Sequence, residues 1–421
     1  MKAYEAILEN FPGESAMSQD DYRQELAANG NPAGVEMEDD IHEFPFDADK
    51  ITISSVPVPV SRLLERLKKE TISSPAIQRS ENLWTIQQQS RLIESLMLRI
   101  PLPLFYVAAD NDENWKIVDG LQRVSALRNY LQNNNFTLSG LEFLIELNGF
   151  QYDNLPPKYQ NRIMDTTLQF AVISSTTPPE VQRNIFKRLN TGGLPLSQQE
   201  IRHALYYDER VAELLLNLAE SSAFQLATDF SINDSRMAAR ELVLRFIAFL
   251  IRDITAYPKN DDMDAFLSDT MLLLSAMPEL REDKLKKLFA FRKNAIETNC
   301  LYTRFEDITD KFTLAMIRAG KLFGSYAFRK SIPPRKRTPI NKALFETIAI
   351  TLCELDEDSF THLVNKKAAL FEAIEKGFQE EIGYTISRDS HKLGSIKKRF
   401  NFFRELFHKF GREDNDSQAL S

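Results

Sequence analysis

The sequence predicts an α+β domain followed by an all-α domain. Between residues 51 and 205, short β-branched apolar runs alternate with segments whose apolar residues recur at helical spacing. Beyond about residue 198, almost every segment carries an apolar stripe with a period near 3.6 residues. Residues 1–50 hold thirteen Asp or Glu against three Lys or Arg. We therefore expect an acidic tail at 1–50, a mixed domain at 51–205 and a helical domain at 206–421.

The composition is that of a globular protein. Of 421 residues, 43% are hydrophobic and 27% are charged, and no run approaches the ~20 apolar residues of a membrane-spanning helix. The N-terminal residues contain one basic residue before position 15 and no continuous apolar core, so they do not resemble a signal peptide. Only Cys300 and Cys353 are present, which argues against a disulfide framework or a thiolate metal site. We expect a cytoplasmic protein without membrane contact.

The net charge of -8 belongs to the tail, because the other 371 residues hold 49 basic and 47 acidic side chains. A segment of this composition is usually solvated and disordered. The other interpretation is that the tail competes with DNA for a basic surface elsewhere in the chain.

The mixed domain begins with an extended segment. Residues 51–60, ITISSVPVPV, are β-branched and contain two prolines, which predicts an edge strand. Ser61 then suits the N-cap of a helix over SRLLERLKKE. A second helix is predicted from Thr85 to Ile100, where Pro101 stops the apolar pattern.

A hairpin and a strand-to-helix junction follow. The apolar runs 101–110 and 115–120 flank the turn sequence DNDEN, and a helical pattern starts after Gly120. Asp119 and Gly120 therefore lie where a strand becomes a helix. Further strands are predicted at 141–147 and 168–175, and a helix at 176–190 that ends at Thr191-Gly192-Gly193.

The second half reads as helices. Apolar stripes are clearest in the segments 241–253, 264–277, 311–323, 340–355 and 360–378.

The first cluster that could carry chemistry is Val118-Asp119-Gly120-Leu121-Gln122-Arg123. A helix N-terminus offers unpaired N–H groups to an anion, and Arg123 could grip phosphate oxygens with a bidentate fork. Asp119 could hold a magnesium ion or orient a water molecule. The plainer interpretation is an Asp-Gly turn beside a solvated Arg.

The second cluster runs from Phe186 to Ser197. Asn190, Thr191 and the Gly192-Gly193 pair could line an anion with N–H groups, while Lys187 and Arg188 neutralise its charge. The pattern GxxxxGK[ST] is absent, so this is not a Walker A loop. On its own the segment also fits a glycine helix terminus followed by a proline turn.

The third cluster is Gln78-Arg79 with Trp84 just downstream. Arg79 could supply another phosphate contact. Trp84 could stack on a base, although packing in the core suits a Trp at a helix entry better.

In order and spacing these three clusters resemble the family built around a DGQQR motif. That family includes the nucleotide-hydrolysing part of GmrSD-type modification-dependent restriction systems and related phage-defence proteins. The resemblance runs from about Ile51 to Leu205. Its residues here are Gln78, Arg79, Trp84, Pro101-Leu102-Pro103, DGLQR at 119–123, Phe186, Arg188, Asn190, Gly192 and Leu196-Ser197.

The resemblance implies a ParB/sulfiredoxin-like α+β fold that binds, and often hydrolyses, a nucleoside triphosphate, coupled to recognition of DNA. The magnesium ion that Asp119 could hold would be the second cofactor. The part from Gly120 to Arg123 also looks like the phosphate-binding box of ParB proteins. The resemblance to the DGQQR family implies catalytic roles for Asp119, Gln122 and Arg123. Leu121 departs from the motif, because it removes one amide side chain that would orient a nucleotide.

Complete members of the restriction type add an HNH-like nuclease, which needs a His base beside metal ligands. None of the five histidines lies in the expected Asp-x-x-His-x-x-Pro setting, so we expect no HNH nuclease in this chain. The five are His42, His203, His362, His391 and His408.

Two basic stretches mark the helical half. The first, 328–342, is loop-like and includes Arg335, Lys336 and Arg337, which we take as the DNA contact. The second, 391–412, interleaves Lys and Arg with five phenylalanines, for which packed rings and solvated cations are the favoured interpretation over base stacking.

The sequence thus supports a defence-associated protein that binds, and as an enzyme hydrolyses, a nucleoside triphosphate. Its nucleotide state would control DNA engagement or a separate nuclease or effector subunit, and self-association is compatible with this role. The alternatives are a non-enzymatic, nucleotide-gated DNA-binding or adaptor protein, and a nuclease of unfamiliar type in the helical half.

Overall fold

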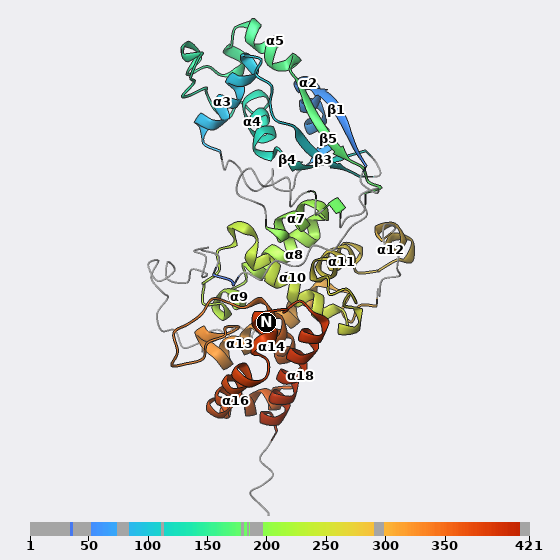
Figure 1. The fold of residues 1–421 in the computed structure, drawn as a ribbon, viewed down its shortest axis with the longest axis vertical. Coiled ribbons are helices and arrows are strands. Elements are labelled where there is room, and N and C mark those ends of the chain that lie inside the picture. Colours follow the sequence, from blue (N-terminus) through green and yellow to red (C-terminus); the bar gives the residue numbers. More distant parts are fainter. Residues whose placement is uncertain are drawn as a thin grey trace, which may run out of the picture. The chain divides into compact units, whose positions relative to one another are not determined.

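The computed structural model describes residues 34–36, 52–73, 84–110, 113–177, 181–182, 185, 197–289 and 299–412. The chain divides into two compact units (Figure 1). The sheet unit is Glu43–Tyr207, and the helical unit comprises Met1–His42 and Asp208–Ser421. The expected order, an α+β region followed by an all-α region, is confirmed.

One mixed sheet forms the centre of the sheet unit, with strand order β1-β5-β3-β4-β2. Strand β1 pairs antiparallel with β5, β3 runs parallel to β5 and antiparallel to β4, and β2 runs parallel to β4. The predicted edge strand and hairpin are therefore confirmed. The strands are β1 (Ile53–Pro59), β2 (Ile72–Ser73), β3 (Phe105–Ala109), β4 (Trp115–Asp119) and β5 (Thr167–Ile173).

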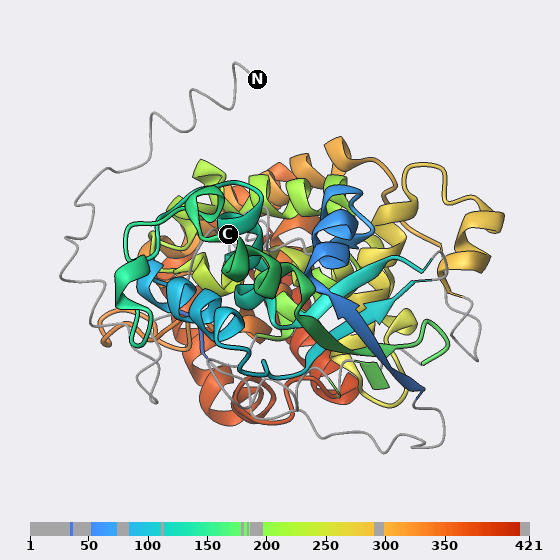
Figure 2. The same ribbon diagram turned by 90° about the horizontal axis from the view of Figure 1, so that it is seen from above.

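The two faces of the sheet pack into different cores because side chains alternate along a strand. Val107 and Ile117 join the larger core, whereas their neighbours Ala108 and Val118 join a smaller one with Ile201. Among the described residues, four helices contribute side chains to the larger core, and Ile201 of α7 contributes to the smaller one. These helices are α2 (Val60–Lys68), α3 (Ile86–Met97), α4 (Leu121–Leu131), α5 (Pro157–Asp165) and α7 (Gln198–Leu205). Figures 1 and 2 show the ribbon from two directions.

Local capping explains where two of these helices begin. The Thr85 hydroxyl accepts from the Gln88 N–H, and the Gln88 side chain accepts from the Thr85 N–H, which completes a capping box. Ser197 and Glu200 do the same for α7. The expectation that Ser61 caps the first helix is wrong, because α2 starts one residue earlier at Val60, whose N–H bonds to the Thr166 carbonyl.

The strand predicted at 141–147 does not form. The Glu94 carboxylate accepts the backbone N–H groups of Glu142, Phe143 and Leu144 at 2.8–3.0 Å, so these groups cannot enter a strand ladder. Burial alone would raise the pKa of Glu94, but the three N–H donors and Arg91 hold it below its ordinary value. A 3₁₀ turn, η3 (Ile145–Leu147), replaces the end of the strand.

Two other helices do not correspond simply to the sequence predictions. The sequence pattern does not predict a helix at Pro157–Asp165. The structure has helix α5 there, which begins on a proline at its first helical position. The predicted helix at 176–190 lies mostly outside the described residues, of which Val181, Gln182 and Ile185 are helical.

The helical unit buries the stripes found in the sequence. The segment 360–378, expected as one helix, forms two, which meet at Lys366. None of the helices in the described part of the chain is both long and apolar enough to span a bilayer. The helices are α8 (Glu209–Ala219), α9 (Ser222–Ala227), α10 (Ala238–Ile251), α11 (Met263–Ala276), α12 (Glu282–Leu288), α13 (Phe305–Phe323), α14 (Lys342–Glu354), α15 (Glu357–Asn365), α16 (Lys367–Glu380), α17 (Gly383–Ser387) and α18 (Leu393–Phe410).

A buried charge network ties α10, α14 and α18 together. The Glu346 carboxylate accepts from Arg245 at 3.0 Å and from Arg399 at 2.8 Å, and all three side chains are almost completely buried. Arg399 comes from the basic stretch 391–412, so one cation there is not solvated. The favoured interpretation of its rings is confirmed, since Phe400, Phe402, Phe403 and Phe407 are buried.

Candidate nucleotide-phosphate site

The junction between β4 and α4 depends on Gly120. Its backbone is left-handed, with φ +97° and ψ 10°, which lets the chain turn from strand to helix in one residue. A Cβ at this position would lie 2.5 Å from Cδ1 of Phe105. Only glycine satisfies both conditions, so the sequence DG fixes the direction in which α4 leaves the sheet.

We expect Gly120→Ala to destabilise the sheet unit by more than the ~1–2 kcal/mol that a left-handed non-glycine residue costs. Gly149→Ala is the matched control, because Gly149 has φ +88° and open space where its Cβ would be. Both tryptophans, Trp84 and Trp115, belong to this unit, so tryptophan fluorescence during urea unfolding follows it selectively. Equal decreases in the free energy of unfolding of the two variants would mean that the Phe105 side chain moves aside at no energetic cost.

The Arg123 side chain is bound by groups of the sheet unit itself. Its guanidinium donates to the Asp119 carboxylate at 2.8 Å, to the Leu104 carbonyl at 3.2 Å and to the Pro103 carbonyl, and it lies 4.2 Å from the centre of the Phe105 ring. Burial lowers the pKa of Arg123, and Asp119 opposes that shift. The side chain is 12% exposed. It therefore ties the start of β3 to the β4–α4 junction.

Some donors remain for a ligand. A guanidinium has five N–H groups, of which the contacts above use three, leaving Nε and one group on Nη1. The N–H groups of Leu121, Gln122 and Arg123, in the first turn of α4, have no partner among the described residues. The half-exposed Gln122 side chain likewise has no partner in that part of the chain. The junction presents donors and positive charge, as an anion site requires.

Asp119 fits a metal ion only in a limited way. Its Oδ2 accepts from Arg123, which leaves Oδ1 for another ligand. No group of three or more His, Cys, Asp or Glu that could hold a metal occurs within the described ranges. Mg²⁺ commonly takes one or two carboxylates and completes its shell with phosphate oxygens and water. A nucleotide would have to supply most of the coordination at Asp119.

Leu121 has a packing role. Its side chain is half-buried and packs against the larger core of the sheet unit. A glutamine amide would be poorly accommodated on such a surface. The departure from DGQQR thus exchanges a polar donor for core contact, whereas Gln122 keeps an amide at the junction.

The other two clusters fall largely outside the described residues. Gln78 and Arg79 do so, as do Arg188, Asn190, Thr191, Gly192 and Gly193. Strand β2, the last described segment before Gln78, runs parallel to β4 and ends with Ser73 opposite Lys116. Trp84 is half-buried and packs against the larger core, as expected for a packing residue.

The expected DNA contact is less open than its sequence suggests. Arg335 is exposed but paired with Glu375, and Arg337 is 15% exposed and paired with Asp229. Lys336 is exposed and has no partner among the residues the structure describes. Of these three cations, Lys336 is the one that can reach a phosphate without first breaking an ion pair seen among the described residues.

Lys116 and the buried polar side chains of α7 were not predicted from the sequence as features of this domain. Lys116 donates to the Leu205 carbonyl at 2.9 Å, and burial lowers its pKa while Asp110 opposes the shift. Gln199, Arg202 and His203 are also buried. A charged residue inside the alternating apolar strand WKIVD was the available signal, since such a residue must find a partner when covered.

Comparison with known proteins gives a family match over the part of the chain that contains the junction. Residues 60–207, about a third of the chain, match the family described as GmrSD restriction endonuclease, N-terminal domain. No curated protein matches the chain. No solved structure matches it either.

Proposed function

We propose that this chain, whose residues 60–207 form a GmrSD-type N-terminal domain, is a defence-associated protein that binds and hydrolyses a nucleoside triphosphate. The nucleotide state would control DNA engagement or a partner effector. The observation that carries this proposal is the β4–α4 junction inside the matched domain, where three first-turn N–H groups and two Arg123 donors have no partner among the described residues and belong to the segment Asp119–Arg123. Such a helix terminus favours phosphate.

The proposed roles follow from the contacts. The first-turn N–H groups and Gln122 would bind phosphate oxygens, and Arg123 would add positive charge while holding Asp119 in place. A magnesium ion held by Asp119 would neutralise charge on the phosphates. Gln78, Arg79, Arg188, Asn190, Thr191, Gly192 and Gly193 are proposed as further nucleotide contacts on the basis of the family resemblance.

Phosphate release from the purified chain tests this proposal. Each of the four ribonucleoside triphosphates is supplied with Mg²⁺, with and without duplex DNA. We expect release with at least one of them, and a rate that changes when DNA is added. Absence of both nucleotide binding and release would rule out the proposal.

A second candidate is a non-enzymatic, nucleotide-gated DNA-binding or adaptor protein. Leu121 packs into the core instead of offering an amide, and Arg123 is largely committed to Asp119 and two carbonyls. Both observations favour binding over catalysis. Nucleotide binding without phosphate release, with or without DNA, would select this candidate.

The exposed cation loop gives a prediction about DNA. We expect Lys336→Ala to weaken binding to any duplex and to reduce the slope of log affinity against log salt by about one unit, because one phosphate contact is lost. Arg337→Ala should instead act mainly on the stability of the helical unit, since it breaks the pair with Asp229. Fluorescence anisotropy at several salt concentrations measures both variants. An unchanged slope for Lys336→Ala would remove this loop from the DNA surface.

A further inference from the structure

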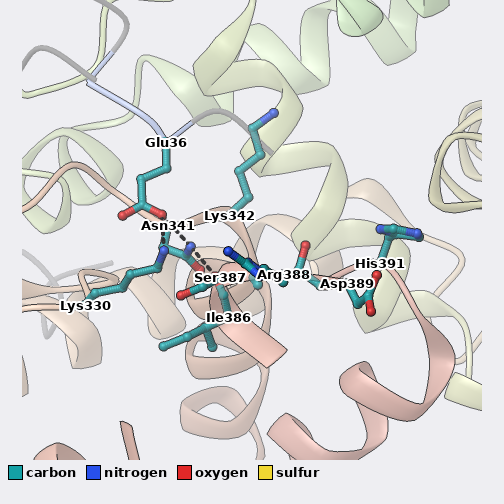
Figure 3. Close-up of a pocket in the computed structure, with 11 residues that line it drawn as sticks. Glu36, Lys330, Asn341, Lys342, Ile386, Ser387, Arg388, Asp389 and His391 are labelled. Carbon is teal, nitrogen blue, oxygen red and sulfur yellow. Dashed lines mark hydrogen bonds and ion pairs between the residues drawn. The ribbon is translucent and has the colours of Figure 1, made fainter. Parts of the chain in front are cut away.

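A polar pocket lies at the N-terminus of α14, within the helical unit (Figure 3). Three stretches of chain meet there: Glu36 from the acidic tail, Lys330 with 341–343, and 386–391. The pocket combines cationic side chains with the N-terminal end of a 13-residue helix. This is a setting that favours an anion.

Residues 34–36 of the acidic tail pair with the chain beside this pocket. Val35 bridges Ile340 in parallel, the Glu36 N–H donates to the Ile340 carbonyl at 2.8 Å, and the Ile340 N–H donates to the Gly34 carbonyl at 3.0 Å. Val35 is buried. A Cβ on Gly34, which has φ +67°, would meet the Ser231 carbonyl oxygen at 1.8 Å. The segment 34–36 is therefore fitted to this surface by backbone pairing, a common mode of peptide recognition.

The Glu36 carboxylate occupies the anion position in the pocket. Its Oε2 accepts from Lys330 Nζ at 2.6 Å and from Asn341 Nδ2 at 2.8 Å (Figure 3). Asn341 is 6% exposed, and its Oδ1 accepts from the Leu344 N–H as the cap of α14. That cap fixes the amide so that Nδ2 points at the carboxylate. Asn341 Nδ2 also donates to the Ile386 carbonyl at 2.9 Å, so two contacts outside the tail hold this amide in place.

The balance of charge around the pocket favours an incoming anion. Lys342 is paired with Glu241, and Asp389 is paired with Lys392. Of the lining residues, Arg388 adds a positive charge to that of Lys330, and the Glu36 carboxylate pairs with Lys330. Removing the Glu36 carboxylate would take this partner from the Lys330 ammonium and from one N–H of the Asn341 amide, whose Nδ2 also donates to the Ile386 carbonyl.

The pocket also flanks the proposed DNA loop. Lys330 precedes and Asn341 follows the segment that carries Lys336, so Glu36 is bound near the two ends of the basic stretch 328–342. The tail itself is strongly acidic, with thirteen acidic and three basic residues in 1–50. A segment of this composition is attracted to the same cationic groups as the phosphates of a nucleic acid.

We propose that the pocket formed by Lys330, Asn341 and Arg388 binds a backbone phosphate of DNA, and that Glu36 of the acidic tail occupies it as an intramolecular competitor. The inference rests on the proposed function, because the ligand is DNA. Tail binding and DNA binding then exclude one another at this pocket. Displacement of the tail raises affinity for DNA.

Full-length variants test the competition by fluorescence anisotropy with a short duplex. We expect Glu36→Gln to tighten DNA binding about three- to tenfold, and Lys330→Gln to weaken it. In the double variant the gain from Glu36→Gln should disappear, because the competitor has lost its receptor. Circular dichroism confirms that each variant folds.

The control for net charge is Glu220→Gln, which changes the same charge on an exposed residue of the helical unit. An equal gain in Glu220→Gln, or no gain in Glu36→Gln, would overturn the competition. A gain that persists in the Lys330→Gln background would also overturn it.

Inorganic phosphate separates this proposal from the proposed function. If phosphate raises the melting temperature of Glu36→Gln more than that of the double variant, the pocket binds anions. With that result and no DNA binding by any variant, the DNA part of the proposed function fails and the proposal of a DNA site fails with it. With Lys336-dependent DNA binding that ignores Glu36, the function stands and only the competition fails.

Discussion

Replacing Glu346 by Gln should lower the free energy of unfolding of the helical unit by about 3–5 kcal/mol. The carboxylate lies between Arg245 and Arg399 at 3.0 and 2.8 Å, and its side chain is fully buried. Gln keeps the shape but leaves two buried guanidiniums with less opposing charge. Breaking one member of a buried ion network is costly because the remaining charges cannot be solvated.

The measurement follows urea unfolding by far-ultraviolet circular dichroism, which reports mainly on the helical unit. Tryptophan fluorescence follows the sheet unit in the same samples, and its transition should not move. Glu354→Gln is the matched control: its partner Arg404 is also on α18, but both side chains are more than 40% exposed. An exposed pair contributes about 0–1 kcal/mol. Similar losses in the two variants would mean that the buried network adds nothing beyond a surface pair.

Asp119→Asn should reduce nucleotide turnover about a hundredfold while leaving nucleotide binding nearly intact. The substitution keeps the shape of the side chain but removes the negative charge that would hold magnesium. Loss of one contact that stabilises the transition state by ~3 kcal/mol corresponds to this factor. Phosphate release and a binding titration with each nucleotide separate the two effects.

Arg123→Ala is the comparison for Asp119→Asn. It removes a contact to Asp119 and two to backbone carbonyls, so both nucleotide affinity and the stability of the sheet unit should fall. If both variants are folded and keep wild-type affinity and turnover, the DGLQR junction is a structural turn and the proposed function is wrong.

The sequence by itself determined the helices, strands and turns whose signals are local. Gly120 is an example, since its lack of a Cβ sets the backbone at that residue, and α4 begins directly after it as predicted. The edge strand β1 is another, because prolines exclude a central position. Periodicity located the helices of the second half for the same reason: it depends on neighbours within two turns.

Tertiary structure decided the fate of polar and charged side chains. Residues 141–147 are apolar enough for a strand, but Glu94, nearly fifty residues earlier, takes their N–H groups. The residues next to Arg399 in the sequence suggest a solvated cation. Its side chain is fully buried, because the Glu346 carboxylate pairs with it. Arg123 appears free in the sequence and is bound by Asp119 and two carbonyls.

The difference has one physical cause. An apolar stripe or a glycine acts through the backbone at its own position, so its effect can be inferred from the letters around it. A charged group acts through a partner whose distance along the chain is arbitrary, and the free energy of burial is favourable only when that partner is in place. The sequence therefore determined the elements of this protein and the family that residues 60–207 match, while the folded chain decided which of its cations remain available to a phosphate.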